Sequence, residues 1–446
     1  MYVRTPKRYT RQGRKRSPLS LRWLWLWILT PLVVVAGIGI YQNQGIFRER
    51  IGGVVDTVVD SAGDRIATIN APTPVPTQDP TENIARANAS WERGAIQEAV
   101  EAYAEIIDAV PNDLNAHYHY TLGLIMEDKD VEALEAAENT VTANPFVADA
   151  WAIRAMALSR TGNYGQAVAS ALHALELAPQ DAAQDNLTVA KSRARALAFL
   201  AEAYFYDDQY ERAASTVQEA LNLDPDCFEA YYVSGLVNWF YNIDRQAAMQ
   251  DFDTAYGTMP NMIYIGIEMS YLESEIQVAS EAPDFTQAEG RIEGILELNP
   301  DNARALYWMG DYYFRTVGDP NRSADYLSRC TNANPNNPSC HYLLGRARMR
   351  QELYSDALLS FETAIDLSVS GDQLFARYNY WAAEASRQLN DLSGCLTYLQ
   401  TAIETAQVLE DQVVLDAYPT LAQQCGGVVI QPTPTPEATA EGEGSG

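Results

Sequence analysis

The prolines of this chain recur at intervals close to 34 residues, and this spacing restricts the possible fold more than any other feature. Pro111, Pro145 and Pro179 lie 34 residues apart. The series continues at spacings of 46, 35, 40 and 35 with Pro225, Pro260, Pro300 and Pro335. A fixed period of this length indicates a repeat protein, in which each unit packs on its neighbours because it cannot bury its apolar face alone.

Each repeat is predicted to be a hairpin of two helices. An alanine stands twelve residues before six of the seven prolines, where two helices would cross closely: Ala99, Ala133, Ala167, Ala213, Ala248 and Ala288. Proline ends the second helix because its ring cannot continue the hydrogen-bond ladder. Ala, Leu, Glu and Gln, which favour helix, dominate this part of the chain. The pattern therefore predicts an all-α fold.

The spacing and residue types resemble the tetratricopeptide repeat (TPR), a 34-residue helix–turn–helix. The third unit matches at Trp151, Ala155, Leu158, Gly162, Tyr164, Ala167, Ala174, Leu175 and Pro179. The eighth matches at Leu344, Gly345, Tyr354, Ala357, Phe361 and Ala364, with Val369 in place of the proline. The resemblance covers residues 82–407 and implies a TPR-like α-solenoid superhelix of about nine repeats. Residues 408–425 are expected to form a capping helix.

Two units are longer than the repeat. About twelve extra residues lie near 181–192 and about five near 274–285. These insertions either lengthen a helix or form loops on a binding edge, and the sequence leaves both interpretations open.

Residues 23–41 form a stretch of 19 residues without a charge. At about 1.5 Å per residue, a helix of this length spans roughly 28 Å, close to the thickness of a bilayer core. Residues 1–22 contain eight Lys or Arg and no Asp or Glu, which places the N-terminus in the cytoplasm. A cleaved signal peptide fits less well, because the apolar stretch is long and lacks an A-x-A site. We therefore expect a single-pass signal anchor in a bacterial plasma membrane, with the repeat array extracytoplasmic.

The segments that flank the array are rich in proline and threonine. Residues 42–81 are predicted to be a juxtamembrane segment followed by a semi-rigid Pro/Thr linker. Residues 426–446, rich in Pro, Thr, Glu and Gly, are predicted to be a disordered tail.

The charge of the chain argues against nucleic acid as a partner. The formal net charge is −28, and beyond residue 22 there are 23 basic against 59 acidic residues. This acidic body would repel phosphates, which bind through Lys and Arg.

The sequence offers no catalytic set, cofactor motif or metal site, so we expect no enzyme. Of the four histidines, His117 and His119 are two residues apart on a predicted helix and point in different directions. No cysteine pair has CxxC spacing. Cys330 with Cys340 and Cys395 with Cys425 either pack as small side chains or, in an oxidising exterior, form disulfides.

By resemblance to the TPR family, the first helix of each repeat lines a concave groove. Candidate partner-binding residues at groove positions are Val237, Phe240, Tyr307, Phe314, Tyr342, Arg346, Arg377, Tyr380 and Arg387. Tyr and Arg dominate interface energetics, and Arg binds carboxylates through two parallel hydrogen bonds. We therefore expect a protein or peptide partner that is acidic or binds by its C-terminus. The alternative is that these side chains pack between helices or pair with carboxylates of the chain itself.

The function that fits best is a membrane-anchored scaffold or adaptor for protein–protein interaction. Two alternatives remain: a dedicated subunit of an envelope secretion or assembly machine, and a cell-wall glycan-binding module. An enzyme is the least supported class.

Overall fold

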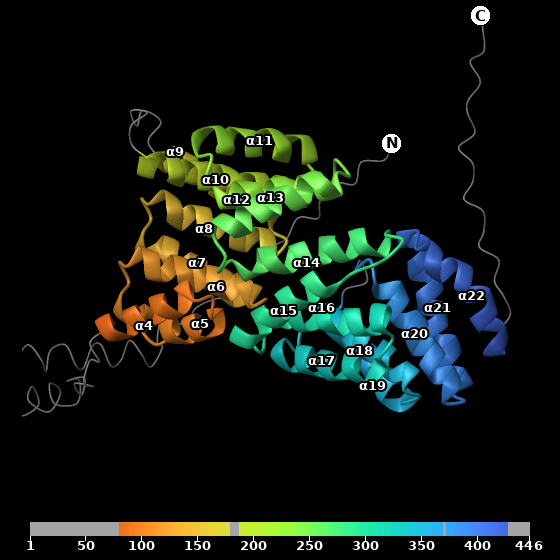
Figure 1. Cartoon of the computed structure of the whole chain (residues 1–446). Coiled ribbons are helices and arrows are strands. Elements are labelled where there is room, and N and C mark those ends of the chain that lie inside the picture. The colour runs from red at the N-terminus through yellow and green to blue at the C-terminus, as the bar shows by residue number, and fades with distance from the viewer. Residues whose placement is uncertain (1–79, 179–186, 369–371, 427–446) are drawn as a thin grey trace, which may run out of the picture. The chain divides into compact units, whose positions relative to one another are not determined.

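The structure, a computed structural model, describes residues 80–178, 187–368 and 372–426 (Figure 1). These residues form nineteen α-helices, α4 to α22, and the predicted all-α fold is confirmed. The first five hairpins are α4 (Pro80–Glu92) with α5 (Ile96–Ala104), α6 (Leu114–Met126) with α7 (Asp130–Ala143), α8 (Ala148–Arg160) with α9 (Tyr164–Leu177), α10 (Leu187–Tyr206) with α11 (Tyr210–Leu223), and α12 (Phe228–Phe240) with α13 (Arg245–Thr258). A 3-10 turn, η1 (Ile107–Ala109), follows α5.

Four further hairpins and a last helix complete the described array. The hairpins are α14 (Ile263–Val278) with α15 (Thr286–Leu298), α16 (Ala303–Tyr312) with α17 (Pro320–Ala333), α18 (Pro338–Arg350) with α19 (Tyr354–Leu367), and α20 (Phe375–Gln388) with α21 (Leu392–Leu409). A π-helical turn, η2 (Tyr313–Val317), extends α16. The last helix, α22 (Gln412–Gln424), packs on α20 and α21.

None of the helices in the described ranges is long and apolar enough to cross a membrane. The predicted anchor at residues 23–41 lies outside the described residues, as do residues 42–79 of the predicted linker (42–81) and residues 427–446 of the predicted tail (426–446). Residues 80 and 81, which were assigned to the linker, begin α4.

Small residues let the two helices of a hairpin approach closely. A Cβ placed on Gly345 would lie 2.5 Å from Phe361, and one placed on Gly235 would lie 2.5 Å from Phe252. Both distances are far below van der Waals contact, so only glycine fits while the phenylalanine fills the space between the helices. This steric limit explains Gly345 of the repeat pattern, whereas Gly162 lies in a turn with a φ of +75°.

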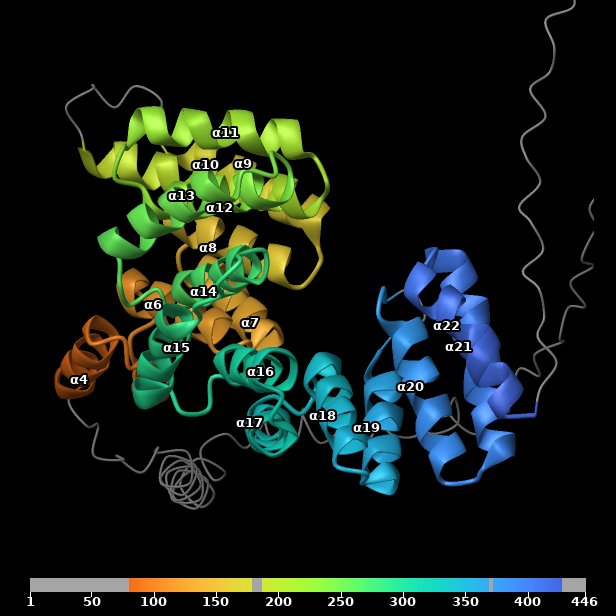
Figure 2. The ribbon, with the colours of Figure 1, turned by 45° about the vertical axis from the view of Figure 1, so that its right-hand side comes forward.

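Asparagine side chains that follow the fifth and sixth hairpins join this part of the array to the first two hairpins. In the connections that follow these hairpins, Asn261 donates to the backbone oxygen of Trp91 at 3.1 Å and Asn302 donates to that of Met126 at 2.8 Å. Asn299 donates to the backbone oxygen of Gly94 at 2.8 Å. Figures 1 and 2 show the result, since α15 lies beside α4 and α6 although it is far from them in sequence. The array therefore turns back on itself.

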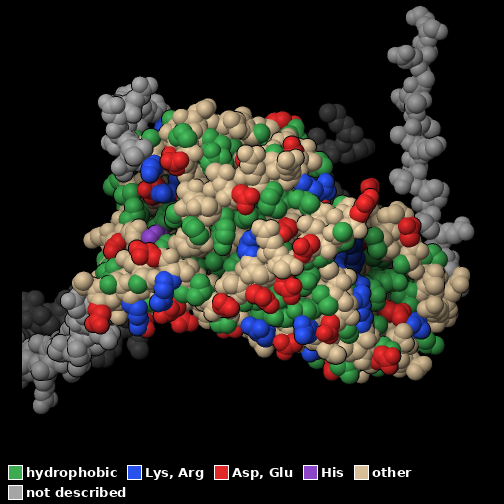
Figure 3. Space-filling view, viewed as in Figure 1, with side chains coloured by type: hydrophobic (Ala, Val, Ile, Leu, Met, Phe, Trp, Pro, Cys, Tyr) green, Lys and Arg blue, Asp and Glu red, His purple; other side chains and the backbone are tan. Residues whose placement is uncertain are grey.

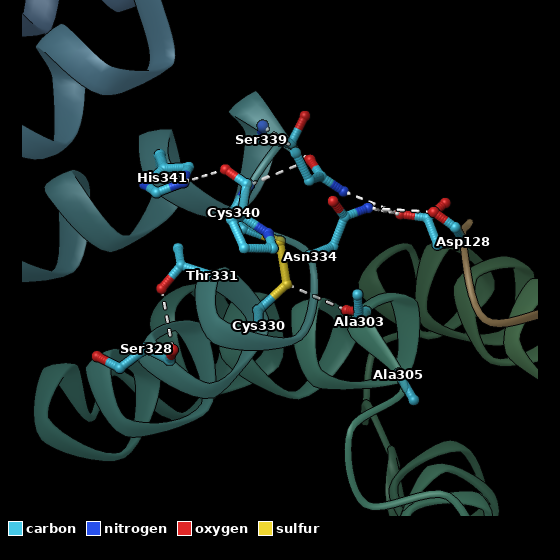
Figure 4. The surroundings of a disulfide bond; sticks show 12 residues. Asp128, Ala303, Ala305, Ser328, Cys330, Thr331, Asn334, Ser339, Cys340 and His341 are labelled. Atoms are coloured by element: carbon cyan, nitrogen blue, oxygen red, sulfur yellow. Dashed lines mark hydrogen bonds between the residues drawn. A yellow bond between two sulfur atoms is a disulfide. The ribbon is translucent and has the colours of Figure 1, made fainter. Parts of the chain in front are cut away.

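Two disulfides fix neighbouring helices in the C-terminal part. Cys330 and Cys340 join α17 to α18 with their Cα atoms 5.9 Å apart (Figure 4). Cys395 and Cys425 join α21 to the end of α22 with a Cα separation of 6.1 Å. Cys227 is a buried thiol. The sequence left open whether the four other cysteines pack as small side chains or form disulfides, and the structure contains both disulfides.

The long sixth unit is accommodated in two ways. Part of its insertion lengthens α14 to 16 residues, and the rest forms the connection 279–285 that leads to α15. Of the insertion near 181–192, residues 181–186 lie outside the described residues, and the remainder begins α10.

Candidate partner-binding surface

The predicted groove residues of the fifth hairpin differ in exposure. Val237 on α12 is 3% exposed and belongs to the core. Phe240, at the end of the same helix, is 54% exposed and stacks on Trp239 with ring centroids 4.6 Å apart. Only Phe240 of this pair presents apolar surface to a partner.

Four predicted residues of the seventh and eighth hairpins lie together. Phe314 in η2 and Tyr342 on α18 are buried, and Tyr307 on α16 packs against the cluster that contains Phe314. Arg346 on α18 donates to the Tyr342 hydroxyl at 3.0 Å. The guanidinium of Arg346 lies 5.1 Å from the ring centroid of Phe314. Phe314, Tyr342 and Tyr307 form the base of a surface, and Arg346 lies over this base.

Arg346 and Arg350, one turn apart on α18, form what we call the arginine pair. Both guanidinium groups lie over Phe314, that of Arg350 at 3.6 Å from the ring centroid. Arg346 also lies 4.0 Å from the ring centroid of Trp381. Burial and the neighbouring Arg346 lower the pKa of Arg350 below its ordinary value. Neither arginine forms an ion pair with a carboxylate in the part of the chain that the structure describes.

The remaining predicted arginines already have carboxylate partners. On α20, Arg377 donates to Asp411 at 2.8 Å, and this hydrogen bond raises the pKa of Arg377. Arg387 donates to Glu384 at 2.8 and 2.6 Å. Tyr380, between them in sequence, is half-buried and packs edge-on against Trp381. Arg377 and Arg387 are therefore less available to a partner than the arginine pair.

Two members of this surface were absent from the sequence prediction. Arg350 is four residues after Arg346, so both lie on one face of α18, and this spacing was a readable signal. Trp381 follows Tyr380 but points toward another helix, and its contact with Arg346 depends on how two hairpins stack. Figure 3 shows Lys and Arg side chains gathered in a hollow of the face near α16 and α20.

The inner surface of the earlier hairpins is filled by the chain's own charged side chains. Arg160 at the end of α8 lies 2.9 Å from Glu202 of α10, and their side chains are only 10% and 1% exposed. Arg160 also donates to the Tyr206 hydroxyl at 3.1 Å. Arg304 of α16 pairs with Glu268 of α14. Arg160 and Arg304 therefore form ion pairs within the protein, which distinguishes them from the arginine pair.

Family models match several parts of the array. A model described as "Anaphase-promoting complex, cyclosome, subunit 3" matches residues 283–364. Two models described as tetratricopeptide repeat match residues 148–181 and residues 200–257 and 342–407. The chain thus contains TPR units. Because stacked TPR units form extended concave surfaces for other proteins, the class defined by fold and repeats is a protein-interaction scaffold.

Several solved structures are similar to the chain at low sequence identity. The APC/C hetero-tetramer Cut9-Hcn1 is 12% identical, with a TM-score of 0.53 over 72% of this chain and 59% of that chain. Pseudomonas aeruginosa PilF is 14% identical, with a TM-score of 0.43 over 53% of this chain and 98% of that one. PilW, a type IV pilus biogenesis factor, is 17% identical, with a TM-score of 0.40 over 46% and 90%. No curated protein sequence matches the chain.

Proposed function

We propose that this chain is a membrane-anchored scaffold that displays its TPR array outside the cytoplasm and binds an acidic segment of a partner protein. The observation that carries the proposal is the arginine pair, two cationic groups without a carboxylate partner among the described residues of a strongly acidic protein. The partner segment lies on the surface formed by the seventh to ninth hairpins.

The electrostatics of the arginine pair favour an anion. Two guanidinium groups held over one phenylalanine ring repel each other, and the lowered pKa of Arg350 reflects this repulsion together with burial. A carboxylate placed against both groups relieves the repulsion and forms charge-assisted hydrogen bonds. The aromatic rings of Phe314 and Trp381 hold the guanidinium planes, so little side-chain entropy is lost on binding.

The location outside the cytoplasm has two separate supports. Residues 23–41 have the length and composition of a membrane span, with the basic cluster on the side expected to stay in the cytoplasm. The two disulfides are typical of proteins in oxidising compartments and are rare in the cytosol. Both observations favour the same proposed location of the array.

The partner is tested by chemical cross-linking in cells, followed by mass spectrometry of what co-purifies with the full-length chain. Arg346→Glu/Arg350→Glu is compared with wild type and with Arg212→Glu/Arg329→Glu. Arg212 and Arg329 also lie over tyrosine rings and also form no carboxylate ion pair among the described residues. We expect one or more proteins to be lost with the first variant and kept with the control. Equal recovery from both variants contradicts the proposed site.

The location is tested by protease treatment of intact cells and by counting thiols. Protease added outside should degrade the array, and denatured protein should offer one reactive thiol, that of Cys227, until a reductant is added. Protection from the protease, or five reactive thiols without reductant, contradicts display outside the cytoplasm.

A further inference from the structure

A half-open pocket of about 300 Å³ lies between α14 and the π-helical turn η2. Its walls are mainly aromatic: Tyr271, Phe285, Trp308 and Tyr312. Trp308 and Tyr312 stack with ring centroids 5.2 Å apart, and Phe285 lies 5.8 Å from Tyr312. We call this site the aromatic pocket. None of its lining residues is among the predicted partner-binding residues.

Two departures from the regular repeat build the aromatic pocket. The insertion of the sixth unit supplies Ser274, Glu275, Val278 and Phe285. The turn η2 supplies Arg315 and Thr316. Insertions in repeat arrays map to one face, often the binding face, and π-helical turns occur frequently at functional sites. Two irregularities that converge on one pocket are therefore evidence for a binding site.

The polar groups of the pocket define what it can hold. The carboxylates already have partners: Asp311 accepts from Arg315 at 2.5 Å, and Glu275 accepts from Trp239 at 2.6 Å. By contrast, the Tyr271 hydroxyl and the Trp308 indole nitrogen make no hydrogen bond to any described residue. With its charges paired, the pocket suits a bulky apolar side chain better than a cation, because little carboxylate charge remains to offset a buried positive group.

The aromatic pocket and the arginine pair share the turn η2. Arg315 of η2 lines the pocket, and the adjacent Phe314 carries both guanidinium groups on its ring. Burial raises the pKa of Asp311 in the pocket wall, and the positive charges of Arg315 and Arg346 partly oppose this rise. One extended segment can therefore occupy both sites, which lie on either side of the same helical turn.

We infer that the aromatic pocket receives a bulky apolar side chain, aromatic or leucine-like, from the same partner segment whose carboxylate lies on the arginine pair. This inference rests on the proposed function and adds the second recognised element of the partner. A buried apolar anchor surrounded by polar contacts is the usual form of an interface hot spot.

A library of random peptides tests this inference. The peptides are displayed in two forms, as internal segments and with a free C-terminus. Binders are selected on the full chain, on Val278→Asp/Phe285→Ala, and on Arg346→Glu/Arg350→Glu. Val317→Asp is the control, because Val317 is 50% exposed on η2 and does not line the pocket, whereas Val278 is 71% exposed and does. All variants must retain the helicity and unfolding temperature of the wild type.

Wild type should select peptides with Phe, Trp, Tyr or Leu near Asp, Glu or a free C-terminus. The pocket variant should lose the apolar preference while keeping the acidic one, with affinity for the selected peptides about tenfold lower or more. The control should select as wild type does. An apolar preference that is absent from the wild-type selection, or that is unchanged in the pocket variant, overturns the inference alone. If the arginine variant keeps both preferences, the proposed function is overturned. If wild type selects no peptides, the result counts against both the inference and the proposed function.

Discussion

The first seven hairpins (residues 80–333) and the last two (residues 338–409) share one kind of core, but the buried arginines of the first region and the arginine pair of the second have different contacts. In the first seven, Arg160 and Arg304 meet carboxylates of neighbouring helices. On the eighth hairpin, Arg346 and Arg350 lie on aromatic rings without such a partner. Each region also contains arginines of the other kind, Arg212 and Arg329 in the first and Arg377 and Arg387 in the second. A repeat array can thus hold an arginine either by a carboxylate of a neighbouring helix or by aromatic rings.

The largest effect is expected from breaking the buried ion pair of the first region. Arg160→Met leaves Glu202, whose side chain is 1% exposed, without its partner. We expect the free energy of unfolding to fall by about 3–5 kcal/mol. Arg346→Met, which removes contacts with aromatic rings and one hydrogen bond to the Tyr342 hydroxyl, should cost about 1–2 kcal/mol. Urea unfolding of both variants measures this difference, and Arg160→Met/Glu202→Leu should recover most of the loss. Equal costs for the two single variants would remove the distinction between the regions.

A pH dependence of stability is expected from a buried carboxyl of the first region. Burial raises the pKa of Glu127 to about 7, while the ordinary value is 4.5. Between these values the folded state binds more protons than the unfolded state, so the free energy of unfolding falls as pH rises from about 4.5 to about 7. The contribution is at most about 3 kcal/mol. Unfolding measured at several pH values should show this slope in wild type and a smaller one in Glu127→Gln; parallel curves contradict the assignment.

The shared core predicts equal costs in the two regions. Gly235→Ala and Gly345→Ala each place a Cβ 2.5 Å from a phenylalanine, and each should destabilise the chain by about 1–3 kcal/mol. Gly290→Ala is the control, since a Cβ there meets no atom within 4 Å and should stabilise its helix by about 0.5–1 kcal/mol. Thermal unfolding distinguishes these cases, and a harmless Gly345→Ala shows that the eighth hairpin packs less tightly than the fifth.

The smallest effect concerns the asparagine contacts. Asn302 accepts from the Ala305 nitrogen as the N-cap of α16 and also donates to the Met126 oxygen. Asn302→Ser keeps an oxygen that can accept at the N-cap but removes the amide group that donates to the Met126 oxygen, which should cost about 1–2 kcal/mol. Asp319→Ser, at the N-cap of α17, changes a cap and a long ion pair with Arg322 and should cost a few tenths of a kcal/mol. Hydrogen exchange of α6 should rise in the first variant alone; if it rises in neither, the contact does not join the hairpins.

The sequence predicted the hairpins well because their causes are local. A proline, a glycine facing Phe361 and an alanine at each crossing act within one unit, so a periodic pattern reveals them. The return of the array on itself was not predictable in this way. The contacts of Asn299 and Asn302 with the first two hairpins depend on rotations that accumulate over several units.

The candidate surface shows the same limit. Arg377 lay at a groove position by resemblance, but its partner Asp411 is 34 residues away, between the ninth hairpin and the last helix, where no repeat pattern applies. The insertion near 274–285 was visible in the sequence, whereas the π-helical turn that completes the aromatic pocket was not, since η2 replaces a regular helical turn without any change in hydrophobic period.

Site-specific photo-cross-linking in cells tests the central claim most directly. A photoreactive amino acid replaces Tyr380, half-buried on the proposed surface, or Leu172, 45% exposed on α9 of the first region. We predict a defined protein adduct at position 380, lost with Arg346→Glu/Arg350→Glu, and none at position 172. An adduct at position 172 alone, or one at position 380 that persists in the arginine variant, would contradict recognition by the C-terminal hairpins.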